Sequence, residues 1–183
     1  MYKRSISIVD SEVRILGRED FLYQLTIHNA SHSYVHKPGV RLHLDVDWYL
    51  KQVNVNWPTF LEMVKTFQVA TRVYFALLIP KELFDTPVPD EVLITLKPPE
   101  WKRKLLAYLI NKAGLFNPHE KKFSKAGYIL FTVLLYDDLI GLWRGIFPVR
   151  SWMQERYGFR YNWLLPYYHL RRLSDLLLKR AVT

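Results

Sequence analysis

The sequence predicts an all-α protein, in which seven or eight helices form an irregular bundle behind one short N-terminal β-hairpin. Apolar residues recur at helical spacing from residue 18 onward. Half of the 183 residues are hydrophobic, which is enough for a sizeable core. The strand-like alternation that stands out lies in residues 4–16, ahead of all the helical patterns.

The expected elements begin with this hairpin over residues 4–16. Ile6, Ile8, Val13 and Ile15 alternate with polar residues around a polar turn. A first helix should follow Gly17, because Glu19 and Asp20 place negative charge in its first turn, and it should run to about His36.

The remaining helices follow from their start and stop signals. Lys37-Pro38-Gly39 should end the first helix, and Asn56 and Asp90 are candidate caps. Gly114 and Gly158 are expected to close two later helices. The predicted helices cover residues 40–53, 57 to about 67, 71–79, 90–96, 101–113, 122–146, 149–157 and 163–181.

Composition predicts one cytoplasmic domain over residues 1–183, with the hairpin in 1–16 and helices in 18–183. The chain has no internal repeat and no long linker. Because it has no cysteine, disulfide scaffolds, thiolate zinc sites and iron–sulfur clusters are excluded. The apolar stretch at 126–136 is too short to span a membrane, and no signal peptide precedes Asp10.

Positive charge is concentrated in the second half of the chain. Residues 1–99 hold 11 basic and 11 acidic residues, whereas residues 100–183 hold 15 and 6. This asymmetry favours an anionic partner: a phosphate, a nucleic acid, an acidic lipid surface or an acidic domain. The candidate anion-binding residues are Lys102, Arg103, Lys104, Arg171 and Arg172.

We expect these cations and Arg180 to be exposed and scattered, with Trp101, Trp143 and Trp163 mostly in the core. A nucleic-acid module would instead need a continuous basic track beside exposed aromatic rings. Nucleic acid is therefore not the favoured partner, and an anionic small molecule remains a candidate.

Asp45 and Asp47 suggest two different structures. On a strand they would share one face, as the metal-binding carboxylates of nucleotidyl transfer do. On a helix they would lie about 200° apart and could not share a metal ion. We favour the helix, because no Gly-Ser turn for a triphosphate occurs between Gly17 and Gly39. We therefore assign no catalytic residue and no metal ligand.

A second candidate site combines His28, His32, Arg41 and Asp45. The two histidines are four residues apart on the first helix, and we expect them to meet Arg41 and Asp45 across the turn at 37–39 as a polar contact. The same spacing also suits zinc, which leaves a metal hydrolase using His28, His32 and Asp45 as an alternative. Histidines that only face solvent are the third possibility.

The order of several motifs resembles a bacterial nucleotidyltransferase-like family. These motifs are Phe21-Leu22-Tyr23-Gln24-Leu25 before His28 and His32, then residues 39–48, Asn56-Trp57-Pro58-Thr59-Phe60, residues 76–89, Ile146-Phe147-Pro148 and Arg156-Tyr157-Gly158. The resemblance extends over nearly all 183 residues and points to the C-terminal helical region of that family. It implies that the DNA-polymerase-β-like catalytic domain is absent from this chain, which would then be part of a longer protein.

The resemblance implies a non-catalytic accessory domain that packs on the missing N-terminal catalytic domain and helps to form the acceptor site. Magnesium and a nucleoside triphosphate are implied only for that catalytic domain, so we expect no cofactor in this chain and no transferase activity from it alone. A binding module for nucleic acid or an anionic ligand, using residues 100–183, is the alternative.

Overall fold

The computed structural model describes residues 6–7, 14–32, 39–114 and 123–175. Contacts divide the chain into an N-terminal unit, residues 1–122, and a C-terminal unit, residues 123–183. Each unit is described here by itself. The single domain expected from the sequence stays a prediction.

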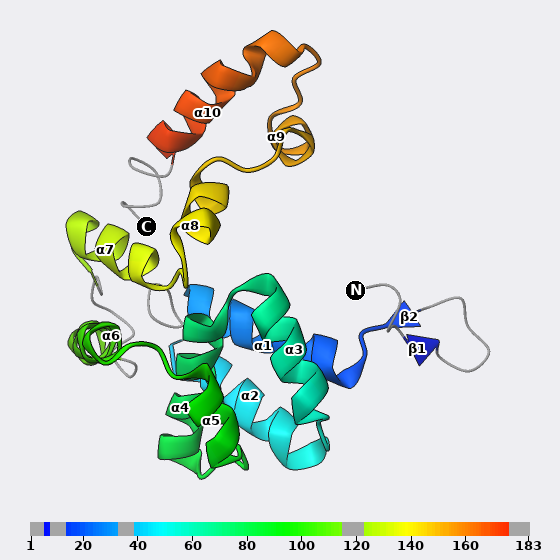
Figure 1. Cartoon of the computed structure of the whole chain (residues 1–183), viewed down its shortest axis with the longest axis vertical. Coiled ribbons are helices and arrows are strands. Elements are labelled where there is room, and N and C mark those ends of the chain that lie inside the picture. The colour runs from blue at the N-terminus through cyan, green and yellow to red at the C-terminus, as the bar shows by residue number, and fades with distance from the viewer. Residues whose placement is uncertain (1–5, 8–13, 33–38, 115–122, 176–183) are drawn as a thin grey trace. The chain divides into compact units, whose positions relative to one another are not determined.

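The described part of the chain is all-α, as the sequence predicted (Figure 1). The expected number of seven or eight helices is too low, because the described residues form ten α-helices. Two two-residue strands precede the helices: β1 (Ile6–Ser7) pairs antiparallel with β2 (Arg14–Ile15), with Ile6 opposite Ile15. Residues 8–13, where the polar turn was predicted, lie outside the described residues. Four paired residues do not establish a hairpin over the whole of 4–16.

The core of the N-terminal unit is formed by helices that pack on α4. The helices are α1 (Arg18–His32), α2 (Arg41–Gln52), α3 (Trp57–Phe67), α4 (Ala70–Phe84), α5 (Asp90–Leu96) and α6 (Glu100–Ala113). In this group α4 packs against α1, α2, α3 and α5 (Figure 1). Its sequence explains this central place, since every residue from Val73 to Leu77 is buried. Such all-round burial is typical of a core helix.

The boundaries of these helices follow from local chemistry. Glu19 and Asp20 lie in the first turn of α1, where the amide ends of the helix favour negative charge. The Asn56 side chain accepts a hydrogen bond from the Thr59 amide at 3.1 Å and so caps α3. Helix α3 ends at Gln68, which adopts a left-handed conformation. The predicted cap at Asn56 is confirmed.

Helix α4 is longer than predicted. The sequence analysis ended it at Ile79, before a proline, but the helix continues through Pro80 to Phe84. Proline removes one backbone donor, which usually breaks or kinks a helix. Here Pro80 is buried, and the helix ends only where Asp85 takes a left-handed conformation with φ of 55°.

The C-terminal unit consists of shorter helices: α7 (Lys125–Leu134), α8 (Leu139–Ile146), α9 (Arg150–Tyr157), the 3-10 turn η2 (Asn162–Leu164) and α10 (Leu165–Ser174). The single helix predicted over 122–146 is wrong, because the chain breaks between α7 and α8. Asp138 causes the new start, since its side chain accepts a hydrogen bond from the Gly141 amide. No helix among the described residues is long and apolar enough to cross a membrane.

Candidate functional site

Helix α2 carries both aspartates that the sequence analysis singled out, and the helical interpretation is confirmed. Asp45 is exposed, whereas Asp47 is buried with 8% of its surface exposed. Residues two apart on a helix point to different sides, so this difference is the expected one. The two carboxylates therefore do not form the metal-binding pair that a strand would present.

The buried carboxylate of Asp47 is held by two side chains. Thr86 donates its hydroxyl to Asp47 Oδ1 at 2.6 Å, and Lys51 donates from Nζ to Oδ2 at 3.0 Å. Lys51 also donates to the carbonyl of Phe84 at 3.0 Å. Asp47 thus fastens α2 to the end of α4 and to the loop that follows it. Such a buried group with charged partners is a structural contact.

A second buried polar contact joins α1 to α2. Asn29 Nδ2 and His43 Nδ1 lie 3.0 Å apart, and both side chains are fully buried. The sequence analysis did not assign this pair. The sequence contains a signal for it, because Asn29 lies seven residues after Leu22 on the buried face of α1, whereas His28 and His32 lie on the exposed face.

The predicted cluster of His28, His32, Arg41 and Asp45 consists entirely of exposed residues. The rings of His28 and His32 lie close together, with centroids 4.6 Å apart. Residues 37 and 38 of the predicted turn that should bring the two helices together lie outside the described residues. The four-residue contact therefore stays a prediction.

The prediction that Lys102 is exposed is wrong. Lys102 is 6% exposed and donates from Nζ to the Thr71 hydroxyl at 3.0 Å, which links α6 to α4. It belongs to the buried stripe of α6 with Leu106 and Leu109, and its aliphatic stem can cover apolar surface. The buried face of α6 is thus rotated by one residue from the expected one, and Trp101 lies outside it.

The prediction that Trp101, Trp143 and Trp163 form part of the core is also wrong. Their exposed fractions are 65%, 63% and 76%. Tryptophan is large and amphipathic, so helical spacing alone overstates its burial. Trp163 lies in η2, ahead of α10, and Trp143 lies on α8, a helix with no buried residue.

The other predicted anion-binding residues have different surroundings. Arg103 is half-buried and pairs with Glu100 at 2.7 Å, and Lys104 is exposed. Hydrogen bonds from Arg103 hold the pKa of Glu100 below its usual range. In the C-terminal unit, Arg171 is exposed, while Arg172 is not, and Arg180 lies outside the described residues. An anion-binding role for these residues stays a prediction.

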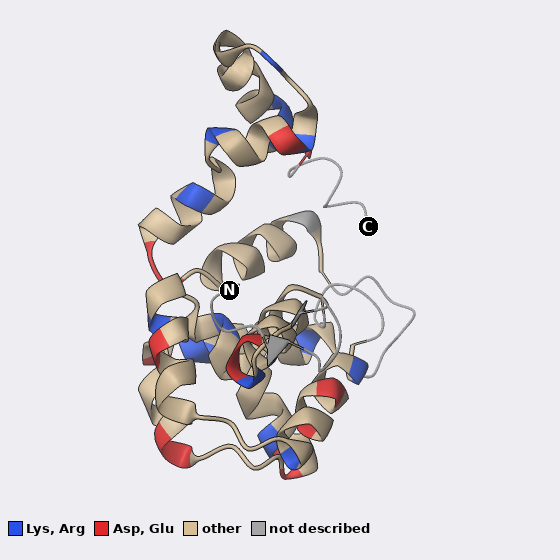
Figure 2. Ribbon diagram, turned by 90° about the vertical axis from the view of Figure 1, so that its right-hand side faces the viewer, with Lys and Arg blue, Asp and Glu red and all other residues tan. Residues whose placement is uncertain are grey.

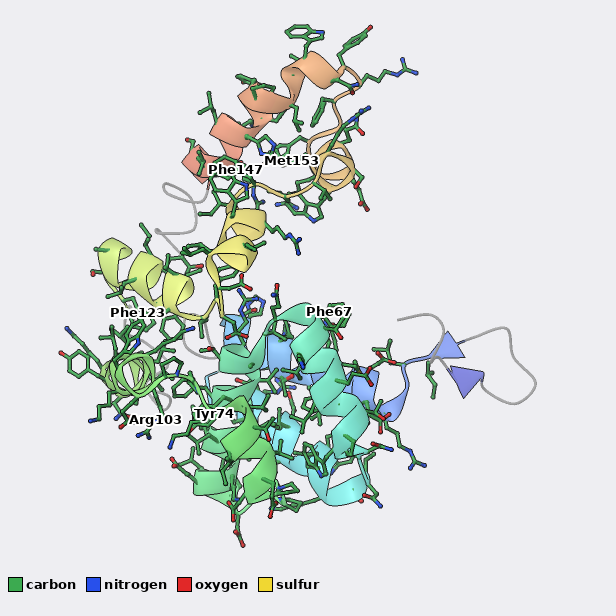
Figure 3. The ribbon with its side chains drawn as sticks, in the orientation of Figure 1. Phe67, Tyr74, Arg103, Phe123, Phe147 and Met153 are labelled. Carbon is green, nitrogen blue, oxygen red and sulfur yellow. The ribbon has the colours of Figure 1, made fainter. Side chains whose placement is uncertain are left out.

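Arg103 also lies beside Tyr74, a buried residue of α4 (Figure 3). Burial raises the pKa of Tyr74 above the ordinary tyrosine value, and the guanidinium of Arg103 partly offsets this. Burial likewise raises the pKa of Tyr23 and of Tyr49. Tyr49 donates its hydroxyl to the Arg18 carbonyl at 2.9 Å, so the neutral phenol has a structural role.

An open pocket of about 380 Å³ lies where α2 ends and α3 begins. Its lining residues are Leu50, Lys51, Gln52, Val53, Asn54, Val55, Trp57 and Pro87. Asp47 holds two parts of the pocket wall: it binds Lys51, which lines the pocket, and Thr86, which precedes the lining residue Pro87. The lining offers amides, one ammonium group and one indole ring. Its volume lies within the range of small-molecule sites, although such sites are usually more enclosed and more apolar.

The described residues do not fit a metal centre. They contain no group of three or more His, Cys, Asp or Glu side chains placed to hold a metal ion. The metal-hydrolase alternative with His28, His32 and Asp45 therefore gains no support from the structure. A magnesium site for nucleotidyl transfer at Asp45 and Asp47 gains no support either, since the two carboxylates lie on different sides of α2.

Comparison with known proteins finds a family model that matches part of the chain. Residues 2–85, somewhat less than half of the chain, match the model of a family described as an uncharacterised nucleotidyltransferase. This N-terminal part of the chain is therefore similar to that family. The matched nucleotidyltransferase region contains α1, α2, α3 and α4, and with them Asp47 and most of the pocket lining. No curated protein and no solved structure matched the chain.

The match corrects what the resemblance implied. The nucleotidyltransferase family region lies in this chain, in its N-terminal part, so the expectation of a C-terminal helical region without it is wrong. The match also ends at residue 85, whereas the resemblance was expected to extend over nearly the whole chain. A missing N-terminal catalytic domain is therefore no longer invoked as a partner. The match assigns no catalytic residue.

Proposed function

We propose that the N-terminal unit binds the acceptor molecule of a nucleotidyltransferase-like protein, and that its described helices do not themselves transfer the nucleotide. The observation that carries this proposal is the state of Asp47. Its carboxylate is buried and engaged by Thr86 and Lys51, while Asp45 lies on the exposed side of the same helix. Metal-dependent transfer needs carboxylates that converge on the ions.

The pocket between α2 and α3 supports the acceptor-binding part of the proposal. It lies almost entirely within the family region, since Pro87 alone among its lining residues falls after residue 85. Its lining includes no carboxylate, and its one lysine is paired with Asp47, which suits a neutral acceptor rather than a cationic one. The indole of Trp57 offers a flat apolar wall for a ring of the acceptor.

The experiment is a transfer assay with the full chain, a labelled nucleoside triphosphate and Mg²⁺ or Mn²⁺. An active nucleotidyltransferase of another family is the positive control. We expect no labelled product from this chain on any of a panel of neutral and anionic hydroxyl acceptors. Label transferred by the wild-type chain, and lost in both Asp45→Asn and Asp47→Asn, would contradict the proposal.

A further inference from the structure

We propose that the turn between α9 and α10 binds single-stranded nucleic acid. This inference goes beyond the acceptor-binding function and rests on other residues. We call residues 156–168 the aromatic tip. It lies in the C-terminal unit, after the point where the family match ends. Single strands are recognised by stacking of bases on aromatic rings and by attraction of phosphates to cations, and the aromatic tip supplies both.

The aromatic tip has a defined scaffold. Helix α9 ends at Gly158, where φ is +69°, a conformation that favours glycine. Phe159 is 6% exposed and stacks on Tyr168 of α10, with ring centroids 4.6 Å apart and an interplanar angle of 12°. Tyr157 also contacts Tyr168, at 5.4 Å. These rings fasten the end of α9 to α10 and so fix the turn between them.

Three further rings of the aromatic tip are exposed. Tyr161, Trp163 and Tyr167 have exposed fractions of 63%, 76% and 57%. Every exposed large apolar side chain of the aromatic tip is one of these three aromatic residues. Trp163 was expected in the core, and its exposure removes the main argument against a nucleic-acid partner. A ring face can stack on any base, whereas an aliphatic side chain cannot.

Cations accompany the exposed rings. Arg156 and Arg160 are exposed, and residues 156–174 contain no Asp or Glu. Figure 2 shows basic positions along the ribbon of this unit. Among the described residues, neither arginine takes part in an ion pair. Both are therefore available to phosphates, which supply most of the affinity for a nucleic-acid chain.

Arg172 differs from Arg156 and Arg160, because its side chain contacts other parts of the C-terminal unit. Its guanidinium donates to the carbonyls of Gly145 and Ile146 at 2.8 and 3.2 Å, and it lies 4.5 Å from the centroid of the Trp152 ring. These contacts connect α10 to the end of α8 and to α9. We assign Arg172 to the scaffold and Arg156 and Arg160 to phosphate binding.

The test measures binding of the full chain to a fluorescently labelled single-stranded oligonucleotide by anisotropy, at low and near-physiological salt. Trp163→Ala and Tyr161→Ala should each weaken binding about tenfold, because each removes a stacking surface. Trp163→Phe keeps a ring and should bind close to wild type. Arg160→Gln should weaken binding and lower its salt dependence by about one phosphate contact.

Matched controls lie in the N-terminal unit. Trp48 is 67% exposed on α2, and Trp48→Ala should leave the affinity unchanged. Lys104→Gln removes an exposed cation that is paired with Glu100 and should also have no effect. Circular dichroism of each variant confirms that the helices remain. The proposal is wrong if Trp163→Ala and Trp48→Ala bind alike, or if the chain binds phosphatidylserine vesicles and the oligonucleotide does not compete.

Discussion

The aspartates of α2 show how much two neighbouring residues of the same type can differ. Asp47→Ala leaves the Thr86 hydroxyl and the Lys51 ammonium without their buried acceptor. We expect this change to lower the free energy of unfolding by about 1–3 kcal/mol. Asp45→Ala, on the exposed side of the same helix, should change it by less than about 0.5 kcal/mol. Urea unfolding of the two variants measures the difference.

Equal effects of these two substitutions would show that Asp47 is not a structural anchor. Such a result would remove the main support for a non-catalytic role of α2. Asn29 and His43 form the other buried polar contact, and Asn29→Ala should destabilise the chain by an amount in the same range of about 1–3 kcal/mol. His28→Ala, one residue earlier and exposed, is its control.

The buried tyrosines make stability depend on alkaline pH. The pKa values of Tyr23, Tyr49 and Tyr74 are raised above 10.0 by burial, so the folded chain binds their protons more tightly than the unfolded chain does. This contribution to stability is complete below pH 10 and is lost as the pH rises through the folded pKa values. We expect the urea midpoint to fall above about pH 10.

Absorption of the phenolate at alkaline pH reports the same groups. Burial raises the pKa of Tyr74, so Tyr74→Phe should remove part of the phenolate signal that develops above the ordinary tyrosine pKa. A single titration of all tyrosines at the ordinary pKa, with the protein still folded, would contradict the burial of these side chains.

Residue patterns predicted some contacts and missed others for identifiable reasons. The helical placement of Asp45 and Asp47 was favoured because no Gly-Ser turn precedes them, and the structure confirms it. The Asp47–Thr86 contact could not be predicted, because it joins residues 39 apart and depends on how α4 packs against α2. The sequence predicted a buried Trp101 and an exposed Lys102, and the structure shows the reverse. Both side chains have apolar surface, so the buried face of the helix could not be assigned to within one residue.

At the scale of single elements, the predicted cap at Asn56 was right, whereas Asp90 lies in the first turn of α5 and does not cap it. Asn56 caps α3, and its backbone amide also donates to Glu19 Oε1 at 2.9 Å, which ties α3 to the first turn of α1. Asn56→Ala should cost about 1 kcal/mol of unfolding free energy through loss of the cap. Asn54→Ala, at an exposed position just before it, should cost less. Thermal unfolding compares the two, and equal midpoints would contradict the capping role.

Two helix boundaries were predicted wrongly, because a residue that can end or start a helix lies within a longer helical pattern. Pro80 suggested an end to α4, but the burial of this segment keeps the helix intact to Phe84. Asp138 lies inside a pattern that appeared continuous over 122–146, and its capping bond to Gly141 starts a new helix. In both cases the sequence contained the relevant residue, while packing or a local hydrogen bond decided its effect.

At the scale of the whole chain, the two units differ in character. The N-terminal unit contains the family region and a buried polar network beside a pocket. The C-terminal unit exposes aromatic rings beside arginines. Composition predicted the charge asymmetry between the two halves, and the exposure of the rings emerged only from the structure. The all-α class was predictable because helical periodicity persists over most of the chain.

The central claim is that the carboxylate of Asp47 stabilises the fold and that neither carboxylate of α2 holds a catalytic metal ion. The most direct measurement is binding of Mn²⁺ to the full chain, followed by its effect on water proton relaxation. We predict that Asp45→Asn and Asp47→Asn leave the Mn²⁺ affinity of the wild-type chain unchanged. A Mn²⁺ site in the wild-type chain that is lost in both variants would contradict the account.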